Sequence, residues 1–256
     1  MTATDGTDPF AGVHRVVFAH AHPDDETLAT GALIQHLTEV GLAVSVVTAT
    51  RGERGEVVAG SGAPPAGSPE LDAHREAELA TALRALGAEG PFFLGEPPAR
   101  ASGLPPRRYL DSGMRWVTPT VAGPGADAGP DAFTAASVAE AAADLAAFLT
   151  SWGADLVVSY QADGGYGHPD HVRMHHVARD SAALTGIGFA EVISIPRDGT
   201  PPDSEGVAWY DRTDRLADLL PALHAHASQF TVDGRDVIHS GGQREPLQLR
   251  IGVRLA

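Results

Sequence analysis

The chain has 256 residues and no cysteine, which excludes disulfides and thiolate metal sites. Its formal net charge is −15, which argues against nucleic acid or an anionic membrane as a partner. No apolar run approaches the roughly 18 residues of a membrane-spanning helix, and the polar start lacks the features of a secretory signal, so we expect a cytoplasmic protein.

The first elements alternate between strand and helix. Arg15 to Ala21 is a short apolar run that we expect to form the first strand. Apolar residues at helical spacing predict a helix from Asp24 to Val40, which Gly41 ends. The β-branched run from Ala43 to Thr50 predicts a second strand.

A helix with clear end signals comes next. It runs from Ser68 to Gly87, with Ser68 as the N-cap, Pro69 in the first position and Gly87 as the stop. Pro91 to Leu94 predicts a short third strand. The segment from Gly95 to Asp131 is rich in Pro, Gly and Arg, and a loop of this length is usually functional or disordered.

The second half continues the alternation. Thr134 to Trp152 is an Ala-rich helix, and Ala154 to Tyr160 is an apolar run typical of a buried strand. A glycine-rich turn from Ala162 to His168 follows, and His171 to Leu184 is expected to be a helix.

The last elements are a strand from Phe189 to Pro196 and an amphipathic helix from Arg212 to Phe230, followed by short strands or coil. Strands that alternate with helices predict one doubly wound, Rossmann-like α/β domain, with a mostly parallel sheet and helices on both faces. We expect this domain to span residues 13–256, after a flexible N-terminus of residues 1–12.

A first polar cluster follows the first strand and consists of His22, Pro23, Asp24, Asp25 and Glu26. His22 and Asp25 are three positions apart, so in a first helical turn they can face one point. Zinc accepts imidazole nitrogen and carboxylate oxygen, so the pair predicts part of a metal site. For Glu26 we favour a structural role, in which an acidic residue in the first turn stabilises the helix dipole.

A second polar cluster follows the strand that ends at Tyr160, where the sequence reads His168, Pro169, Asp170 and His171. Ligands of open α/β sheets bind at the carboxyl ends of the strands, so the two clusters can converge there. His171 can then complete the ligand set. This leaves His168 free for acid or electrostatic work, with Asp170 to orient it.

Three other histidines are expected to be structural. His20 faces the same side of its strand as His22, and we favour packing behind the site over ligation. His175 lies one helical turn after His171, and a surface or supporting role is favoured. For His226, a role near the site and a role as a packed helix histidine stay open.

The pair His-Pro-Asp-Asp-Glu and His-Pro-Asp-His resembles the PIG-L/LmbE-like superfamily of zinc-dependent de-N-acetylases. Four further stretches resemble its actinobacterial mycothiol-pathway branch, namely Gly52 to Glu56, Arg75, Asp111 to Met114, and His226 to Gln229. That branch includes the N-acetylglucosaminyl-inositol deacetylase and the mycothiol-conjugate amidase.

The resemblance implies a role for each matching residue. His22, Asp25 and His171 would hold Zn²⁺, or another divalent metal such as Fe²⁺, and Asp24 would be the general base. His168, supported by Asp170, would be the acid or electrostatic partner, and Tyr166 would assist the oxyanion. The residues expected to contact the substrate are Arg75, Asp111, Glu56 and Met114.

We therefore expect hydrolysis of the N-acetyl group of a GlcNAc-type sugar conjugate, either an N-acetylglucosaminyl-inositol or an amino-sugar natural product. The partner would be this small molecule, and a homo-oligomer stays open. Two alternatives use the same scaffold: a mycothiol-conjugate amidase and a non-catalytic sugar-binding protein. The amidase branch typically carries a lysine soon after the first motif, and this chain has no lysine, which favours the deacetylase. A metallophosphoesterase would need more bridging carboxylates.

Overall fold

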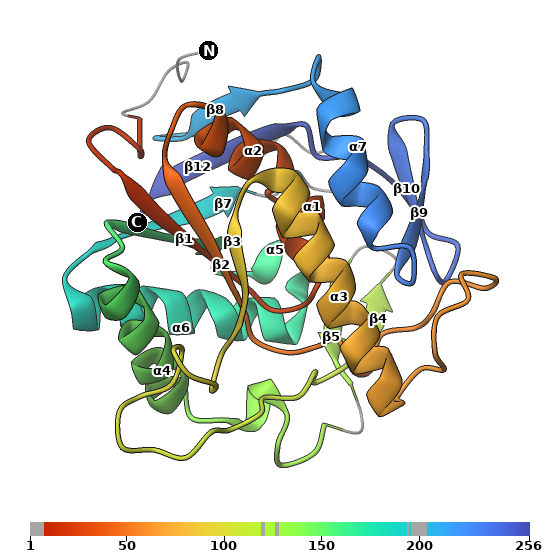
Figure 1. The fold of residues 1–256 in the computed structure, drawn as a ribbon, viewed down its shortest axis with the longest axis horizontal. Coiled ribbons are helices and arrows are strands. Elements are labelled where there is room, and N and C mark those ends of the chain that lie inside the picture. The colour runs from red at the N-terminus through yellow and green to blue at the C-terminus, as the bar shows by residue number, and fades with distance from the viewer. Residues whose placement is uncertain (1–7, 119–120, 126–127, 194, 196–203) are drawn as a thin grey trace.

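A seven-stranded sheet runs through the centre of the molecule (Figure 1). The structure is a computed structural model that describes residues 8–118, 121–125, 128–193, 195 and 204–256. Across the sheet the strands are β3 (Glu89–Phe93), β2 (Ala43–Thr48), β1 (Arg15–His20), β6 (Leu156–Tyr160), β7 (Gly188–Ile193), β12 (Arg250–Leu255) and β8 (Ala208–Asp211). The first five are parallel, and β12 runs antiparallel to both of its neighbours.

Helices cover both faces of this sheet. α2 (Gly31–Glu39), α3 (Pro69–Leu86) and α7 (Leu216–Ala225) pack on one face, and α4 (Val138–Trp152) and α6 (Pro169–Thr185) pack on the other. β1 contributes alternate residues to the two cores because successive side chains of a strand point to opposite faces. The predicted single-domain, doubly wound α/β fold with a mostly parallel sheet is confirmed.

The long helices begin and end where their caps predict. Ser68 Oγ accepts a hydrogen bond from Leu71 N at 3.2 Å, and Gly87, with φ 76°, ends α3 in the left-handed conformation. Ser137 caps α4 in the same way, after a short 3-10 turn η1 (Phe133–Ala135). The predicted start of this helix at Thr134 is therefore a few residues early.

The prediction of one continuous helix from Asp24 to Val40 is wrong. The structure has two helices there, α1 (Asp25–Leu28) and α2. At the break, Thr30 Oγ1 donates to Glu26 O at 2.9 Å and lies 2.9 Å from His20 Nε2. This side chain is tied to β1, so Thr30 leaves the helical conformation with φ −132° and ψ −2°.

The short strands within residues 95–131 and β8 were not predicted, whereas short strands or coil were expected after Phe230. β4 (Met114–Thr118) and β5 (Val121–Pro124) form an antiparallel hairpin inside the expected long loop. β8 and the small antiparallel sheet of β9 (Phe230–Asp233), β10 (Asp236–His239) and β11 (Arg244–Pro246) occupy the C-terminal part, which shortens α7 relative to the prediction. β7 ends at Ile193, and residues 194 and 196 of the strand predicted to Pro196 lie outside the described residues.

The start of the described chain packs against the body. Residues 1–7 of the predicted flexible N-terminus lie outside the described residues. Phe10 is buried, and its ring centroid lies 5.6 Å from that of Tyr210 on β8. Tyr210 also donates a hydrogen bond to Asp8 Oδ1 at 2.6 Å. Within the described chain, no helix has both the length and the apolar character needed to cross a membrane.

Candidate active site

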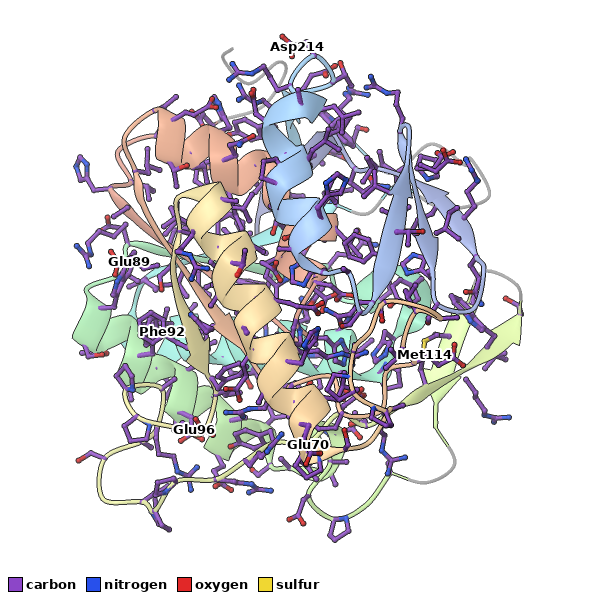
Figure 2. The ribbon with its side chains drawn as sticks, turned by 45° about the vertical axis from the view of Figure 1, so that its right-hand side comes forward. Glu70, Glu89, Phe92, Glu96, Met114 and Asp214 are labelled. Atoms are coloured by element: carbon purple, nitrogen blue, oxygen red, sulfur yellow. The ribbon has the colours of Figure 1, made fainter. Side chains whose placement is uncertain are left out.

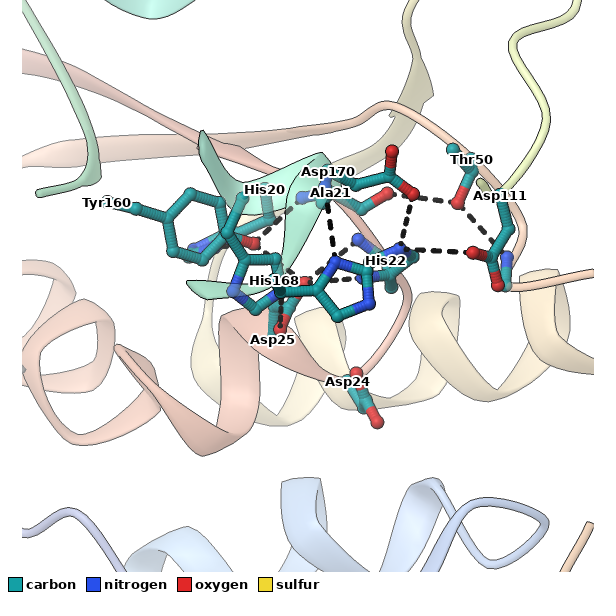
Figure 3. A network of polar contacts seen from close by, with 12 residues as sticks. His20, Ala21, His22, Asp24, Asp25, Thr50, Asp111, Tyr160, His168 and Asp170 are labelled. Carbon is teal, nitrogen blue, oxygen red and sulfur yellow. Dashed lines mark hydrogen bonds and ion pairs between the residues drawn. The ribbon is translucent and has the colours of Figure 1, made fainter. Parts of the chain in front are cut away.

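The two polar clusters meet beside the carboxyl ends of β1 and β6. These strands are neighbours, yet the chain reaches β2 and β3 on one side of β1 before it returns to form β6 on the other. This reversal of strand order opens a crevice at the sheet edge, the usual ligand position in such folds. Figure 3 shows the side chains that converge there from both segments.

Asp25 lies between the two histidines predicted to be its fellow ligands. Its Oδ2 is 3.3 Å from His22 Nδ1, and its Oδ1 is 3.2 Å from His171 Nε2. Two three-residue groups among the described residues have ligand atoms within 4.8 Å of one another: His22, His168 and His171, and His22, Asp111 and Asp170. The predicted ligands are thus adjacent, with His168 beside them.

His171 has the arrangement of a metal ligand. Its Nδ1 lies 3.2 Å from Gly164 O, and since a carbonyl only accepts, the ring proton sits on Nδ1. Nε2 is then a lone-pair donor, and this buried atom makes no hydrogen bond. A buried imidazole nitrogen without a hydrogen-bond partner, beside a carboxylate and two more imidazoles, fits a divalent cation. The cluster can therefore hold a metal.

His22 is oriented by carboxylates on its far side. Its Nε2 lies 3.2 Å from Asp170 Oδ2 and 3.7 Å from Asp111 Oδ1. Burial by itself lowers the pKa of His22, but the adjacent carboxylates outweigh it and hold this pKa well above the ordinary value. A carboxylate on one ring nitrogen leaves the other directed toward the cluster, as is usual behind metal-ligating histidines.

Asp170 does not orient His168 through its carboxylate, as we expected. The carboxylate accepts hydrogen bonds from Ser112 N at 2.9 Å and Ser112 Oγ at 2.5 Å, and its Oδ2 faces His22. Only the backbone N–H of Asp170 reaches His168, donating to Nδ1 at 3.2 Å. The reason is local: His168 is the N-cap of α6, so its ring folds over the first turn while the Asp170 side chain points away.

The protonation of His168 also differs from that of the acid that we expected. Because Nδ1 accepts the Asp170 N–H, the proton of a neutral ring sits on Nε2. Burial, together with the imidazoles of His171 and His22, lowers the pKa of His168 to about 2. The ring is therefore neutral, and its Nε2–H is the group available to donate.

Asp24 stands apart from this network (Figure 3). Its carboxylate makes no hydrogen bond to the described residues, and it lines the cavity beside the cluster. Burial raises the pKa of Asp24 to about 7, and the negative charge of Asp25 adds to this rise. A carboxylate with a pKa near neutrality, open to a cavity and near a metal-capable cluster, is suited to accept a proton.

Tyr160 is the main residue of the site that the sequence reasoning missed. Its hydroxyl donates to Asp25 Oδ2 at 2.6 Å and accepts from Ala21 N at 2.8 Å. Its ring stacks on His171 with centroids 4.1 Å apart and an angle of 6°. The available signal was its position as the last residue of β6, at the strand edge where both clusters lie. His20 and His175, expected to support the site, both contact Tyr160.

A cavity of about 1140 Å³ opens from the cluster. All of the predicted site residues except Asp170 line it. Met114 reaches it from β4 (Figure 2), and Tyr166 stacks beside Trp116 of the same hairpin, with centroids 5.8 Å apart. The first cluster, the glycine-rich turn and the long loop are therefore brought together around one space.

Arg75 differs most from its predicted contact with sugar hydroxyls. Its side chain is only 2% exposed, and the guanidinium donates to the carbonyl oxygens of Gly52, Gly55 and Glu56. It therefore holds the loop that carries Glu56. The Glu56 carboxylate accepts from Ser240 Oγ at 3.3 Å, while Asp111 accepts from Arg54 N at 3.2 Å.

The far wall of the cavity comes from the C-terminal part, where no site residue was predicted. Polar side chains on or beside the small sheet contribute to it: Gln229, Arg235, His239, Ser240, Gln243 and Glu245. Apart from Gln229, which ends the stretch His226 to Gln229, these residues form no motif in the sequence, so only the folded chain shows that they face the cavity.

Comparison with known proteins agrees with this geometry. Residues 17–182 match the family model described as PIG-L, GlcNAc-PI de-N-acetylase. A 1D-myo-inositol 2-acetamido-2-deoxy-alpha-D-glucopyranoside deacetylase of Kineococcus radiotolerans is 35% identical over 86% of this chain and 70% of that protein. The protein of the same name from Mycolicibacterium gilvum is 38% identical over 86% of this chain and 83% of that protein.

The fold also resembles that of solved deacetylases. The N,N'-diacetylchitobiose deacetylase of Pyrococcus horikoshii superposes with a TM-score of 0.62 at 22% identity, over 89% of this chain and 74% of its own. A deacetylase of the teicoplanin biosynthesis pathway superposes with a TM-score of 0.60 at 19% identity. The match covers 94% of this chain and 98% of that deacetylase. At such identities the likeness concerns the fold.

Fold and site together define an α/β protein with a metal-capable histidine and aspartate cluster at the switch point of its sheet. From the extent of the family match, the chain belongs to the PIG-L family of de-N-acetylases. It is thus an N-deacetylase, a hydrolase of amide bonds.

Proposed function

We propose that the protein removes the acetyl group from an N-acetylglucosaminyl-inositol or a closely similar sugar conjugate, with Zn²⁺ held by His22, Asp25 and His171. The observation that carries the proposal is the convergence of these side chains on the lining of a cavity that Asp24 also lines. The relatives named above as 1D-myo-inositol 2-acetamido-2-deoxy-alpha-D-glucopyranoside deacetylases support this choice of substrate.

Each polar group has a task in amide hydrolysis. A bound divalent cation supplies positive charge that lowers the pKa of a water molecule and polarises the amide carbonyl. Asp24 accepts the proton of the attacking water. The Nε2–H of neutral His168 donates to the amide oxygen as it gains negative charge, and Tyr166 assists there. Asp24 then returns its proton to the leaving amine.

The sugar is held by the walls of the cavity. Asp111 and Glu56 present carboxylate oxygens to hydroxyl groups, and Met114 gives an apolar contact. Arg75 contributes indirectly, because it fixes the backbone of the loop that carries Glu56.

The test is acetate release from N-acetylglucosaminyl-inositol, compared with a panel of other N-acetylated sugars and a mycothiol conjugate. We expect the inositol conjugate to be the best of the panel. Removal of metal with a chelator should abolish turnover, and added Zn²⁺ should restore it. Preference for the mycothiol conjugate, or turnover that is unchanged in metal-free protein, contradicts the proposal.

Two substitutions separate the metal ligands from the base. Asp24→Ala should retain metal but lower kcat by roughly 10²–10⁴-fold, the usual contribution of a general base. His22→Ala should lose both metal and activity. Metal content measured on the purified variants checks the assignment, and equal loss of metal in both variants would show that Asp24 is a ligand.

A further inference from the structure

Asp24 has an unusual backbone. Among the described residues it is the one non-glycine residue with a positive φ, at 117°. An L-residue resists this conformation, so the surrounding structure has to hold it. The conformation also decides where the carboxylate points, because it turns the chain between Pro23 and α1.

Glu26 holds this backbone from behind. Its Oε2 accepts a hydrogen bond from Asp24 N at 3.0 Å, and its Oε1 accepts from Thr27 Oγ1 at 2.5 Å. The side chain of Glu26 is fully buried. A carboxylate in such a place requires donors on both oxygens.

His226 supplies the remaining donor from the other end of the chain. Its Nε2 lies 2.7 Å from Glu26 Oε1, and its ring is fully buried at the end of α7. Its Nδ1 lies 3.2 Å from Gln229 Nε2, which leaves the ring proton on Nε2, toward Glu26. A continuous chain of contacts thus connects α7 to the backbone of Asp24.

We infer that Glu26 and His226 are positioning residues that hold the backbone of Asp24 in its unusual conformation and thereby direct its carboxylate to the attacking water. This inference rests on the proposed role of Asp24 as general base. It extends that role by naming a buried pair, about 200 residues apart in the sequence, that acts on the reaction without touching the substrate.

The test measures kcat, KM, metal content and melting temperature of the zinc-loaded Glu26→Gln variant. The substitution keeps the shape but turns one accepting oxygen into an N–H group that faces a donor. Misplacement of a reacting group by about 1 Å can lower a rate roughly 10²-fold. We expect kcat to fall by roughly 10- to 100-fold with KM and metal content little changed.

Asp144→Asn is the matched control. Asp144 on α4 is also a fully buried carboxylate with donors on both oxygens, accepting from Ala101 N at 2.8 Å, Tyr109 Oη at 2.8 Å and Arg100 Nη1 at 2.7 Å, and it makes no hydrogen bond to Asp24, Glu26 or His226. We expect it to lower the melting temperature with kcat unchanged. A purely structural role of Glu26 would give the same result as this control, and would overturn the inference.

If Glu26→Gln does not fold, two variants of His226 test the positioning role instead. His226→Gln keeps an N–H donor for Glu26 and should retain most of kcat, whereas His226→Leu removes the donor and should lower kcat. Equal kcat in these two variants overturns the inference. Full activity of Asp24→Ala would instead refute the proposed base, and the two failures are therefore distinguishable.

Discussion

At the scale of single residues, the site combines groups whose protonation is set by burial. His168 stays neutral, whereas the pKa of Asp24 rises to about 7. A proton acceptor, Asp24, and a neutral hydrogen-bond donor, His168, thus both line the cavity at neutral pH. Neither property is visible in the residue types, since both depend on the desolvation and the neighbouring charges that the fold produces.

The raised pKa of Asp24 predicts a pH dependence. The base accepts a proton only when ionised, so kcat should fall as the pH falls through the pKa of Asp24. A bound cation favours the ionised form and lowers this pKa, so the acid limb should lie between the ordinary carboxylate value and about 7. A pH profile of kcat checks this, and an acid limb that persists in Asp24→Ala would assign it to another group.

Tyr160→Phe should weaken metal binding. The hydroxyl donates to Asp25 Oδ2, and such supporting bonds are typically worth 10- to 100-fold in metal affinity. The ring and its stacking on His171 remain in the variant. Competition with a coloured chelator measures the affinity. Tyr210→Phe, which loses a comparable bond to Asp8, is the control and should bind metal as the parent does.

At the scale of elements, the glycine-rich turn α5 (Gly164–Gly167) holds His171 in place. Gly164 has φ 69°, and a Cβ there would lie 2.9 Å from His171 Cβ and from Val172 N. The carbonyl of Gly164 also fixes the tautomer of His171. The turn therefore has both a conformational and an electrostatic effect on the cluster.

Gly164→Ala should lower both stability and metal affinity, because the new methyl group displaces the start of α6. Gly186→Ala is the matched control at the other end of that helix, since Gly186 has φ 74° but no atom within 4 Å of its ideal Cβ. Both variants should lose roughly 1 kcal/mol or more of unfolding free energy from backbone strain. Metal affinity should fall only in Gly164→Ala, and an equal effect in both contradicts this role of the turn.

The sequence predicted those elements whose signals are local. Ser68 and Gly87 mark the ends of α3 directly, and the apolar runs of β1, β2 and β6 indicate buried strands. The break at Thr30 could not be predicted, because it depends on a contact with His20. The short strands β4, β5 and β9 to β11 also lack a pattern of their own, since their pairing is decided by residues elsewhere in the chain.

The candidate site, like the fold, was predictable from the sequence only where its signals are local. Motif residues such as His22 and His171 were identified because their spacing and their positions after strands are local features. Contacts across the fold were not, and this is why Asp170 was paired with His168 and Tyr160 was overlooked. Arg75 was assigned to the substrate although its guanidinium is occupied by backbone carbonyls.

At the scale of the whole molecule, the start of the described chain stabilises the far edge of the sheet. Phe10 packs on Tyr210 of β8, and this strand is the edge strand beyond β12. Because β8 pairs with β12, this packing connects the start of the described chain to the strands formed after residue 207.

Phe10→Ala should lower the unfolding free energy by about 3–5 kcal/mol, the usual loss for a buried phenylalanine, with kcat unchanged below the transition. Urea denaturation measures this loss. Leu104→Ala, at a position 47% exposed, should change stability by less than about 0.5 kcal/mol. Equal urea concentrations at the unfolding midpoint for the two variants would mean that Phe10 does not contribute to the core.

The family match ends at residue 182, whereas the far wall of the cavity is built after that point, from Gln229 to Ile251. The reacting groups and the surface opposite them therefore belong to separate stretches of the chain. Exchange or mutation in the later stretch can reshape the space around a bound conjugate while His22, Asp25 and His171 keep their places. This division gives laboratory evolution a natural target: libraries confined to residues 235–251 would explore new acceptable conjugates on an unchanged hydrolytic centre.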